Sequence, residues 1–287
     1  MTGAGAPDGA KDDYRLTRTG TKPEQIASYA ALLSAVFPET DRFDRAYLQW
    51  QYVENPDGEV VGFDAFAGDE LAAHYVTIPI SASYKGETIK GVLSLNTATH
   101  PSHQGKGLFT RLASQTYDLA QSLGYKFVVG VANQNSTPGF LRKLGFVLVA
   151  PLDVRVGLGR PVGNAEGAAF ARVWSDEAWA WRIGNPAAGY WSGPQAVYAD
   201  PGQAGIKMLV ASGHVAPGVP RGSGRGLRPL TGWIGLKPGL RWRGIGVAVP
   251  DRMRPSPLNL IFKSLDPAIG VPEAATTTFE AIDFDAY

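Results

Sequence analysis

Two glycines separated by a single residue, Gly105 and Gly107, form the part of this sequence best suited to bind a charged ligand. Glycine has no Cβ, so neighbouring backbone N–H groups can converge on an anion at such a turn. A helix that starts there adds its unsatisfied N–H groups and the positive end of its dipole. The ligand that this combination fits best is a pyrophosphate.

The elements around this turn support that interpretation. The sequence predicts a long strand over residues 87–100, a helix over 106–123, and a continuous apolar strand over 125–131 that is buried on both faces. Gly124 ends the helix in the position that a C-terminal glycine prefers. Strand, turn, helix and strand in this order form a βαβ crossover, which seats phosphates at its first turn.

Other elements are predicted on both sides of this unit. The sequence indicates a strand at 14–18, helices at 22–36, 44–52 and 136–144, strands at 60–67 and 71–84, and a further strand up to about residue 157. Beyond Arg160 helical periodicity is rarer, and Gly, Pro and Trp are more frequent. The segment 181–189 resembles 50–58, with one gap, so the C-terminal half is interpreted as a degenerate copy of the N-terminal half.

Two segments of the chain carry a family resemblance. The segment 97–108, with its turn Gln104-Gly105-Lys106-Gly107-Leu108, resembles the acyl-CoA signature of the GNAT superfamily of N-acyltransferases, Gln/Arg-x-x-Gly-x-Gly/Ala. A second segment, from Asn133 to the ending Lys143-Leu144-Gly145-Phe146, resembles the next element of that family at the right separation. The resemblance covers residues 14–157, about half of the chain.

The resemblance implies a cofactor site. The N–H groups of residues 104–109 would hold the pyrophosphate, the strand edge at 97–99 would pair with the amides of pantetheine, and an asparagine after the fifth strand would lie at the other end. The implied cofactor-binding residues are Thr97, Ala98, Thr99, Gln104, Gly105, Lys106, Gly107, Leu108, Phe109, Asn133 and Asn135. The acceptor would enter over the first two helices, near residues 50–55.

Three departures from the family pattern concern packing and proton transfer. Phe109 stands where Gly or Ala is usual, which predicts altered packing of the helix start, and Leu141 stands where a tyrosine often protonates the leaving thiolate. The carboxylate that some members carry on the fourth strand is also missing. For transfer to an amine, Ser94 and Asn96 are expected to share a strand face and orient a water, and His74 has a suitable intrinsic pKa.

Composition narrows the function classes. The chain has 287 residues, of which 44% are hydrophobic and 18% charged, and its net charge of +1 gives no reason to expect nucleic acid or an anionic membrane as partner. The absence of cysteine excludes a thiol nucleophile and thiolate ligands, and the histidines lack a carboxylate at metal-ligand spacing, so no metal site is predicted. With no apolar leader and no bilayer-length apolar run, a cytoplasmic protein is expected.

These observations predict an α/β protein with a mixed central sheet and flanking helices, divided into a flexible tail at 1–13, an acyl-CoA-binding domain at 14–157 and a degenerate second half at 158–287. The expected reaction moves an acyl group, in the first place acetyl, from acyl-CoA to a primary amine of a small molecule, for which a nucleotide-linked amino sugar is the leading acceptor. The alternatives are acylation of a lipid amine with a longer acyl-CoA, a peptidoglycan-type aminoacyltransferase, and a non-catalytic acyl-CoA-binding regulator.

Overall fold

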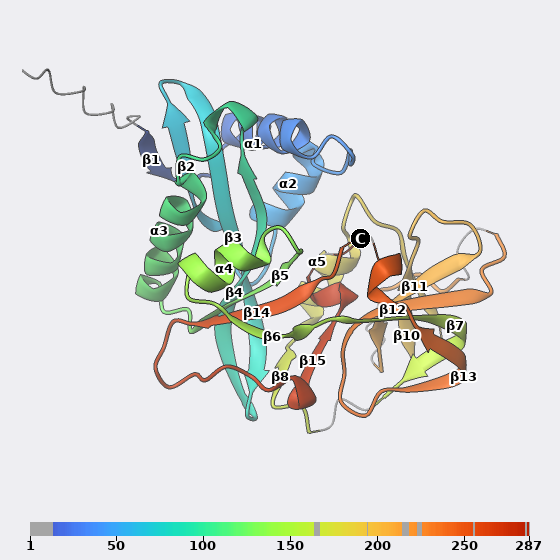
Figure 1. Ribbon diagram of the computed structural model, residues 1–287. Coiled ribbons are helices and arrows are strands. Elements are labelled where there is room, and N and C mark those ends of the chain that lie inside the picture. The colour runs from blue at the N-terminus through green and yellow to red at the C-terminus, as the bar shows by residue number, and fades with distance from the viewer. Residues whose placement is uncertain are drawn as a thin grey trace, which may run out of the picture.

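The computed structural model describes residues 14–163, 167–193, 195–213, 218–222, 226–254, 256–284 and 286. The tail predicted at 1–13 lies outside the described residues. All strands among the described residues join one mixed sheet that runs through two lobes (Figure 1). The predicted α/β class is therefore confirmed. Among the described residues, no helix has the length and apolar character needed to cross a membrane.

The first lobe contains the elements predicted up to residue 151. These are β1 (Arg15–Arg18), α1 (Pro23–Val36), α2 (Arg45–Tyr52), β2 (Val61–Ala67), β3 (Glu70–Tyr84), β4 (Glu87–Thr99), α3 (Leu108–Ser122), β5 (Phe127–Ala132), α4 (Thr137–Lys143) and β6 (Val147–Pro151). Helices α1 and α2 cover one face of the β3–β4 pair, and α3 covers the other (Figure 1). Buried leucines of α1 and α3 fill these two faces.

The second lobe is built mainly from short strands. The elements of the chain after residue 152 are β7 (Asp153–Val162), β8 (Phe170–Arg172), α5 (Asp176–Ile183), β9 (Tyr190–Gly193), β10 (Ala196–Ala199), β11 (Ile206–Ser212), β12 (Leu230–Leu236), β13 (Arg241–Ala248), β14 (Asn259–Ser264) and β15 (Thr277–Glu280). Of these, β8 and β14 pair with strands of the first lobe. The described residues of the segment 213–229 contain no helix. Among the described residues, the connection from β11 to β12 therefore has no helix equivalent to α3, which connects β4 to β5 in the first lobe.

Strand order in the second lobe repeats that of the first. In the first lobe β2, β3 and β4 pair antiparallel, and β4 then pairs parallel with β5. In the second lobe β9, β10 and β11 pair antiparallel, and β11 then pairs parallel with β12. Helix α2 precedes the first set and α5 the second, as the likeness of segments 50–58 and 181–189 predicts.

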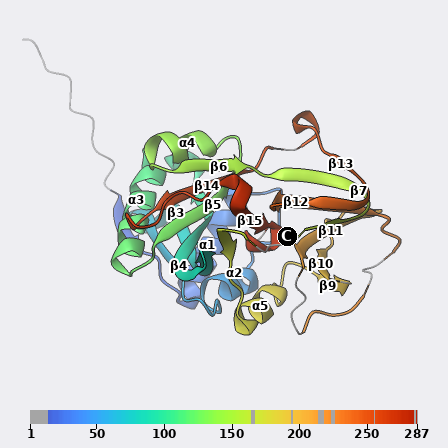
Figure 2. The same ribbon diagram turned by 90° about the horizontal axis from the view of Figure 1, so that it is seen from below.

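Two segments connect the lobes and bear on the site. Strand β14, late in the chain, inserts between β5 and β6 and pairs antiparallel with both. Strand β7 follows β6 directly, yet it pairs with β12 and β13 in the second lobe (Figure 2). The first lobe is thus completed by a strand from the C-terminal half of the sequence. The division at residue 157, which falls within β7, stays a prediction.

Candidate functional site

The site begins where two parallel strands separate. Strands β4 and β5 pair only from Val92–Val128 to Ser94–Gly130, after which no described strand lies next to β4 on that side. The gap opens into a cavity of about 1010 Å³, lined by the end of β4, the turn after it, the start of α4 and the loop before α2. The predicted strand edge at 97–99 borders this cavity through Thr97 and Thr99, whereas Ala98 is buried.

The glycine turn forms one wall of the cavity. Gly105 and Gly107 have φ values of 77° and 73°, in the left-handed region that favours glycine, and a Cβ at either position would meet no atom within 4 Å. Within the described residues, the backbone N–H groups of Gly105 and of residues 107–110 have no acceptor. Since these N–H groups surround the start of the 15-residue helix α3, the turn fits a pyrophosphate as the sequence predicts.

Phe109 contributes to the packing of the helix start, as its departure from the usual Gly or Ala predicts. Its ring packs edge-on against Phe140 and Tyr75, with centroids 5.2 Å and 5.9 Å apart. A Cβ at position 139 would lie 3.2 Å from the Phe109 ring, so Gly139 leaves room for it. Leu141, where a tyrosine is frequent in the family, packs with this apolar cluster and does not line the cavity.

The two predicted asparagines have different roles in the structure. Both Asn133 and Asn135 line the cavity. The Oδ1 atom of Asn133 accepts from the backbone N–H groups of Asn135 and Ser136, at 3.0 Å and 2.9 Å, and so holds the turn that starts α4. The side chain of Asn135 makes no hydrogen bond within the described residues, which leaves it available to a ligand.

The expectation that Ser94 and Asn96 share a face is wrong. The register between β3 and β4 shifts between His74 and Val76, and Asn96 has a φ of 45° at the extra residue of this bulge. Ser94 therefore bonds Tyr75 on the α3 side, at 2.7 Å, whereas Asn96 bonds residues of α2 on the opposite side. Both residues still line the cavity, because β4 separates from β5 at this point.

His74 is fully buried and does not line the cavity. Its Nδ1 atom lies 2.7 Å from Oδ1 of Asp64, and its Nε2 atom lies 2.9 Å from the hydroxyl of Tyr52. Asp64 is the direct cross-strand partner of His74 on β2, and it also accepts from Thr19 and Tyr29. Neither Asp64 nor Tyr52 is among the residues predicted from the sequence. The β2–β3 hairpin signals that a residue near Asp64 lies opposite His74, but a register shift in the hairpin decides which one.

A second row of hydroxyls extends from Ser94 on the other face. The Tyr75 hydroxyl lies 2.7 Å from Ser94 Oγ and 2.5 Å from the Tyr117 hydroxyl on α3. Burial raises the pKa of Tyr75 to about 12, so its hydroxyl stays protonated at neutral pH. Ser94 thus presents to the cavity a hydroxyl that is held by the protonated phenol of Tyr75. This hydroxyl can donate or accept a hydrogen bond.

The histidines at the turn acquire a carboxylate partner that is distant in sequence. His103 Nε2 lies 3.6 Å and His100 Nδ1 3.9 Å from the carboxylate oxygens of Glu70. The ligand atoms of these three residues lie within 4.8 Å of one another. Glu70 is about 30 residues away from these histidines in the sequence and is brought beside them only by the fold. The absence of a metal site therefore stays a prediction.

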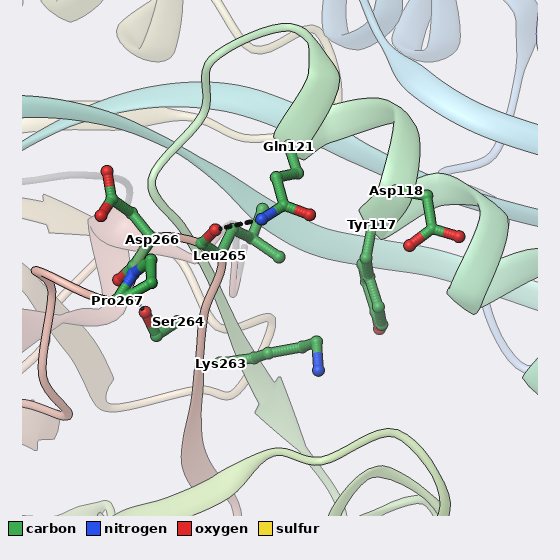
Figure 3. Close-up of a pocket in the computed structure, with 8 residues that line it drawn as sticks. All are labelled: Tyr117, Asp118, Gln121, Lys263, Ser264, Leu265, Asp266 and Pro267. Carbon is green, nitrogen blue, oxygen red and sulfur yellow. Dashed lines mark hydrogen bonds between the residues drawn. The ribbon is translucent and has the colours of Figure 1, made fainter.

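A smaller hollow of about 380 Å³ lies at the opposite end of α3, between Tyr117, Gln121 and the end of β14 (Figure 3). Gln121 Nε2 donates to the Leu265 carbonyl, at 2.7 Å, and Lys263 Nζ donates to the Leu144 carbonyl, at 2.9 Å. Because these contacts already engage its central polar side chains, the hollow offers fewer groups to a ligand than the cavity between β4 and β5.

Comparison with known proteins agrees with this geometry. Residues 18–149 match the family model of the acetyltransferase (GNAT) domain. A search of curated proteins found no match to the sequence.

Solved structures resemble the whole two-lobed fold. One is a probable N-acyltransferase from Enterococcus faecalis, with a TM-score of 0.62 and 8% identity over 88% of this chain and 73% of that chain. Another is a GCN5-related N-acetyltransferase from Anabaena variabilis, with a TM-score of 0.59 and 12% identity over the same shares. A putative acetyltransferase from Pyrococcus horikoshii has a TM-score of 0.51 and 12% identity over 93% of each chain. At these identities the likeness concerns the fold alone.

The matched domain contains the separated strands, the glycine turn and the start of α3, which together form the site described above. We conclude that this chain contains a GNAT acetyltransferase domain, over residues 18–149, and is an acyltransferase.

Proposed function

We propose that the protein transfers an acetyl group from acetyl-CoA to a primary amine of a small molecule. The observation that carries the proposal is the row of unpartnered backbone N–H groups at the glycine turn, next to the open edge of β4. The turn would hold the pyrophosphate, the edge of β4 would pair with pantetheine, and Asn135 would bond the far end of the same ligand.

The reaction follows from this placement. The nitrogen lone pair of the amine forms a bond to the thioester carbonyl carbon, and the C–S bond breaks with its electron pair going to sulfur. The proton lost by the nitrogen ends on the sulfur, directly or through a water, so that the products are an amide and free CoA. Ser94 is the cavity hydroxyl best placed to hold that water, because Tyr75 fixes it from behind.

The proposed acceptor class rests on the remaining walls of the cavity. Glu39 and Arg42, in the loop before α2, line it together with Phe284 and Ala286 from the C-terminal half. The site is thus enclosed by both halves of the chain and includes charges of both signs. A polar small amine fits such walls, and an amino sugar linked to a nucleotide is the first acceptor to test.

Apolar lining supports a longer acyl group as a second candidate. Val36, Phe37 and Phe43 come from the α1–α2 region, and Leu258 and Ile261 come from β14 or the residue before it. These side chains suit a hydrocarbon chain better than an acetyl group alone, which would favour a lipid amine as acceptor.

The test is an assay of CoA release with acetyl-CoA and a long-chain acyl-CoA, each against amino sugars, nucleotide-linked amino sugars, polyamines, peptides and sphingoid amines. The proposal expects release with acetyl-CoA that depends on one small amine and disappears when that amine is already acetylated. Release only with long-chain acyl-CoA and a sphingoid amine would establish the second candidate. Tight acyl-CoA binding with no amine-dependent release would contradict both.

A further inference from the structure

A chain of hydrogen bonds runs from the buried carboxylate of Asp64 to the cavity. His74 Nδ1 lies 2.7 Å from Asp64, and Tyr52 lies 2.9 Å from Nε2 of His74. Asn96 Nδ2 then donates to the Tyr52 hydroxyl at 3.1 Å. Asp64, His74 and Tyr52 are buried, and Asn96 is the member of the chain that lines the cavity.

The direction of every bond in this chain can be assigned. The carboxylate of Asp64 accepts from Thr19 and Tyr29. Because a carboxylate can only accept, Nδ1 of His74 carries a hydrogen and donates to it as well. Burial raises the pKa of Tyr52 above its ordinary value, so its hydroxyl keeps a proton. The only acceptor within the described residues for that proton is His74 Nε2, which must therefore carry none.

This assignment determines which atom of Asn96 faces the ligand. One amide hydrogen of Asn96 is donated to Tyr52, and the other to Oε1 of Gln51, at 2.5 Å. Gln51 presents Oε1 because its own Nε2 donates to the Tyr47 hydroxyl, at 2.9 Å. Both hydrogens of the Asn96 amide are thus engaged by α2, and its Oδ1 atom has no partner within the described residues.

The backbone of Asn96 reinforces this orientation. Its φ of 45° lies in the left-handed region, which asparagine tolerates better than most residues, and the bulge at this position points the side chain toward α2. Gln51 and Tyr52 are nevertheless buried, so a ligand in the cavity meets Asn96 and not the residues behind it.

We propose that Asn96 Oδ1 accepts a hydrogen bond from the N–H of the acceptor amine, and that Asp64, His74 and Tyr52 are positioning residues that hold this oxygen toward the cavity. The inference rests on the proposed N-acyl transfer. An N–H held by this oxygen turns the nitrogen lone pair away from Asn96, toward the part of the cavity beside the open edge of β4. A thioester carbonyl offers no hydrogen to this oxygen, so the residue binds the acceptor and not the acyl group.

Two kinetic variants test this role. Tyr52→Phe removes the hydroxyl between His74 and Asn96, and Asn96→Gly removes the amide while keeping a residue that adopts the observed φ. Each variant is expected to raise the KM for the amine by about tenfold, the loss of one oriented hydrogen bond, with the KM for acyl-CoA unchanged within about twofold. A role in folding alone would change both constants or neither.

The matched control is Tyr84→Phe at the far end of β3. The Tyr84 hydroxyl also accepts a partly buried hydrogen bond, from the backbone N–H of Gly270 at 3.0 Å, but Tyr84 does not line the cavity. Its loss should leave both KM values unchanged. Circular dichroism and thermal unfolding show whether each variant folds, and Asn96→Gly keeps the test available if Tyr52→Phe does not.

A third measurement does not depend on turnover. Nitrogen-15 NMR of the wild-type protein is expected to show His74 with a proton on Nδ1 and none on Nε2. A protonated Nε2 would reverse the chain and overturn the inference. Wild-type release of CoA combined with an unchanged amine KM in both variants would overturn it as well, without affecting the proposed function. Failure of the wild type to release CoA with any amine would instead overturn the proposed function, and this inference with it.

Discussion

Trp50 and Trp181 exchange hydrogen bonds across the contact between the two lobes. The indole N–H of each donates to the backbone carbonyl of the other, at 2.7 Å and 2.8 Å, and the two rings stack with centroids 4.7 Å apart. Their helices, α2 and α5, begin after the N-cap residues Asp44 and Ser175. The side chain of each N-cap accepts from the backbone N–H three residues later, that of Tyr47 or Ala178. The two residues thus occupy equivalent places in the repeated segments, and their contacts are reciprocal, as in a local two-fold arrangement.

This reciprocity predicts equal effects of equivalent substitutions. Trp50→Phe and Trp181→Phe each remove one buried indole donor and leave one buried carbonyl without its partner. Each should lower the free energy of unfolding by about 2–3 kcal/mol, and the double variant should lose less than the sum, because the two rings touch. Urea unfolding measures these values.

Trp242→Phe is the control for that experiment. It also removes an indole donor to a backbone carbonyl, that of Leu158 at 2.9 Å, but this bond is exposed, so water can replace it. A loss below about 1 kcal/mol is expected there. Clearly unequal losses at positions 50 and 181 would contradict the symmetric role.

Gly107→Trp tests the phosphate turn. A Cβ at position 107 would point into open space, so the indole of the variant can lie over the start of α3. It should block the N–H groups there and raise the Kd for acyl-CoA by about tenfold or more. Gly86→Trp is the matched control, because Gly86 also has a positive φ, of 89°, and open space around its Cβ, but lies in the β3–β4 turn away from the cavity. Isothermal titration with acetyl-CoA gives both constants, and equal affinities for the two variants would remove this turn from the site.

The sequence predicted the elements that depend on local patterns. Helical periodicity located α1 and α3, and the glycine turn is recognisable because a positive φ and a helix start leave a mark on neighbouring residues. Strands β1 to β5 lie within a few residues of their predicted ranges for the same reason. The single strand predicted up to about residue 157 is wrong, because the chain breaks it at Leu152 into β6 and β7. These features require only interactions between residues that are close in the chain.

The features that were missed depend on register or on distant pairing. The turn around Gly68 allows a register of β2 against β3, but a shift between Ala65 and Phe66 determines that Asp64 lies opposite His74. The bulge at Asn96 likewise reverses the side on which it is expected. Insertion of β14 between β5 and β6 is a long-range choice, for which no local pattern in the sequence gives a signal.

Asn133 and Asn135 are expected to separate stability from binding. Asn133→Ala removes the acceptor of two backbone N–H groups before α4 and should cost about 1 kcal/mol of unfolding free energy. Asn135→Ala removes no hydrogen bond within the described residues, so its effect on stability should stay within about 0.5 kcal/mol. Its Kd for acetyl-CoA should instead rise by about threefold to tenfold, as for one lost hydrogen bond to a ligand. Calorimetry of binding and of unfolding on both variants distinguishes the roles, which would be reversed if Asn133 were the ligand-binding residue.

Asp283 predicts a pH dependence of stability that is independent of the site. Burial raises the pKa of this carboxyl to about 6, and the nearby Glu280 adds to the increase, against the Glu280 backbone N–H, Arg172 and Trp174, which lower it. The folded protein therefore holds this proton more tightly than the unfolded chain, in which an aspartate has a pKa of about 3.9. The resulting stabilisation is present in full below about pH 4 and is lost as the pH rises through about 6.

Asp283→Asn tests this dependence, because an amide carries no charge at any pH and its single oxygen can still accept from one of the two donors, Trp174 Nε1 or the backbone N–H of Glu280. The loss of the other bond lowers stability equally at every pH and does not affect the comparison. The free energy of unfolding of the wild type minus that of the variant should fall by an amount on the order of 3 kcal/mol between pH 4 and pH 7. Asp69→Asn, at the exposed β2–β3 turn, provides the surface comparison. Urea unfolding at several pH values gives the difference directly, and a difference that is constant with pH would show that Asp283 is ionised throughout, with its charge held by Arg172 and the surrounding N–H groups.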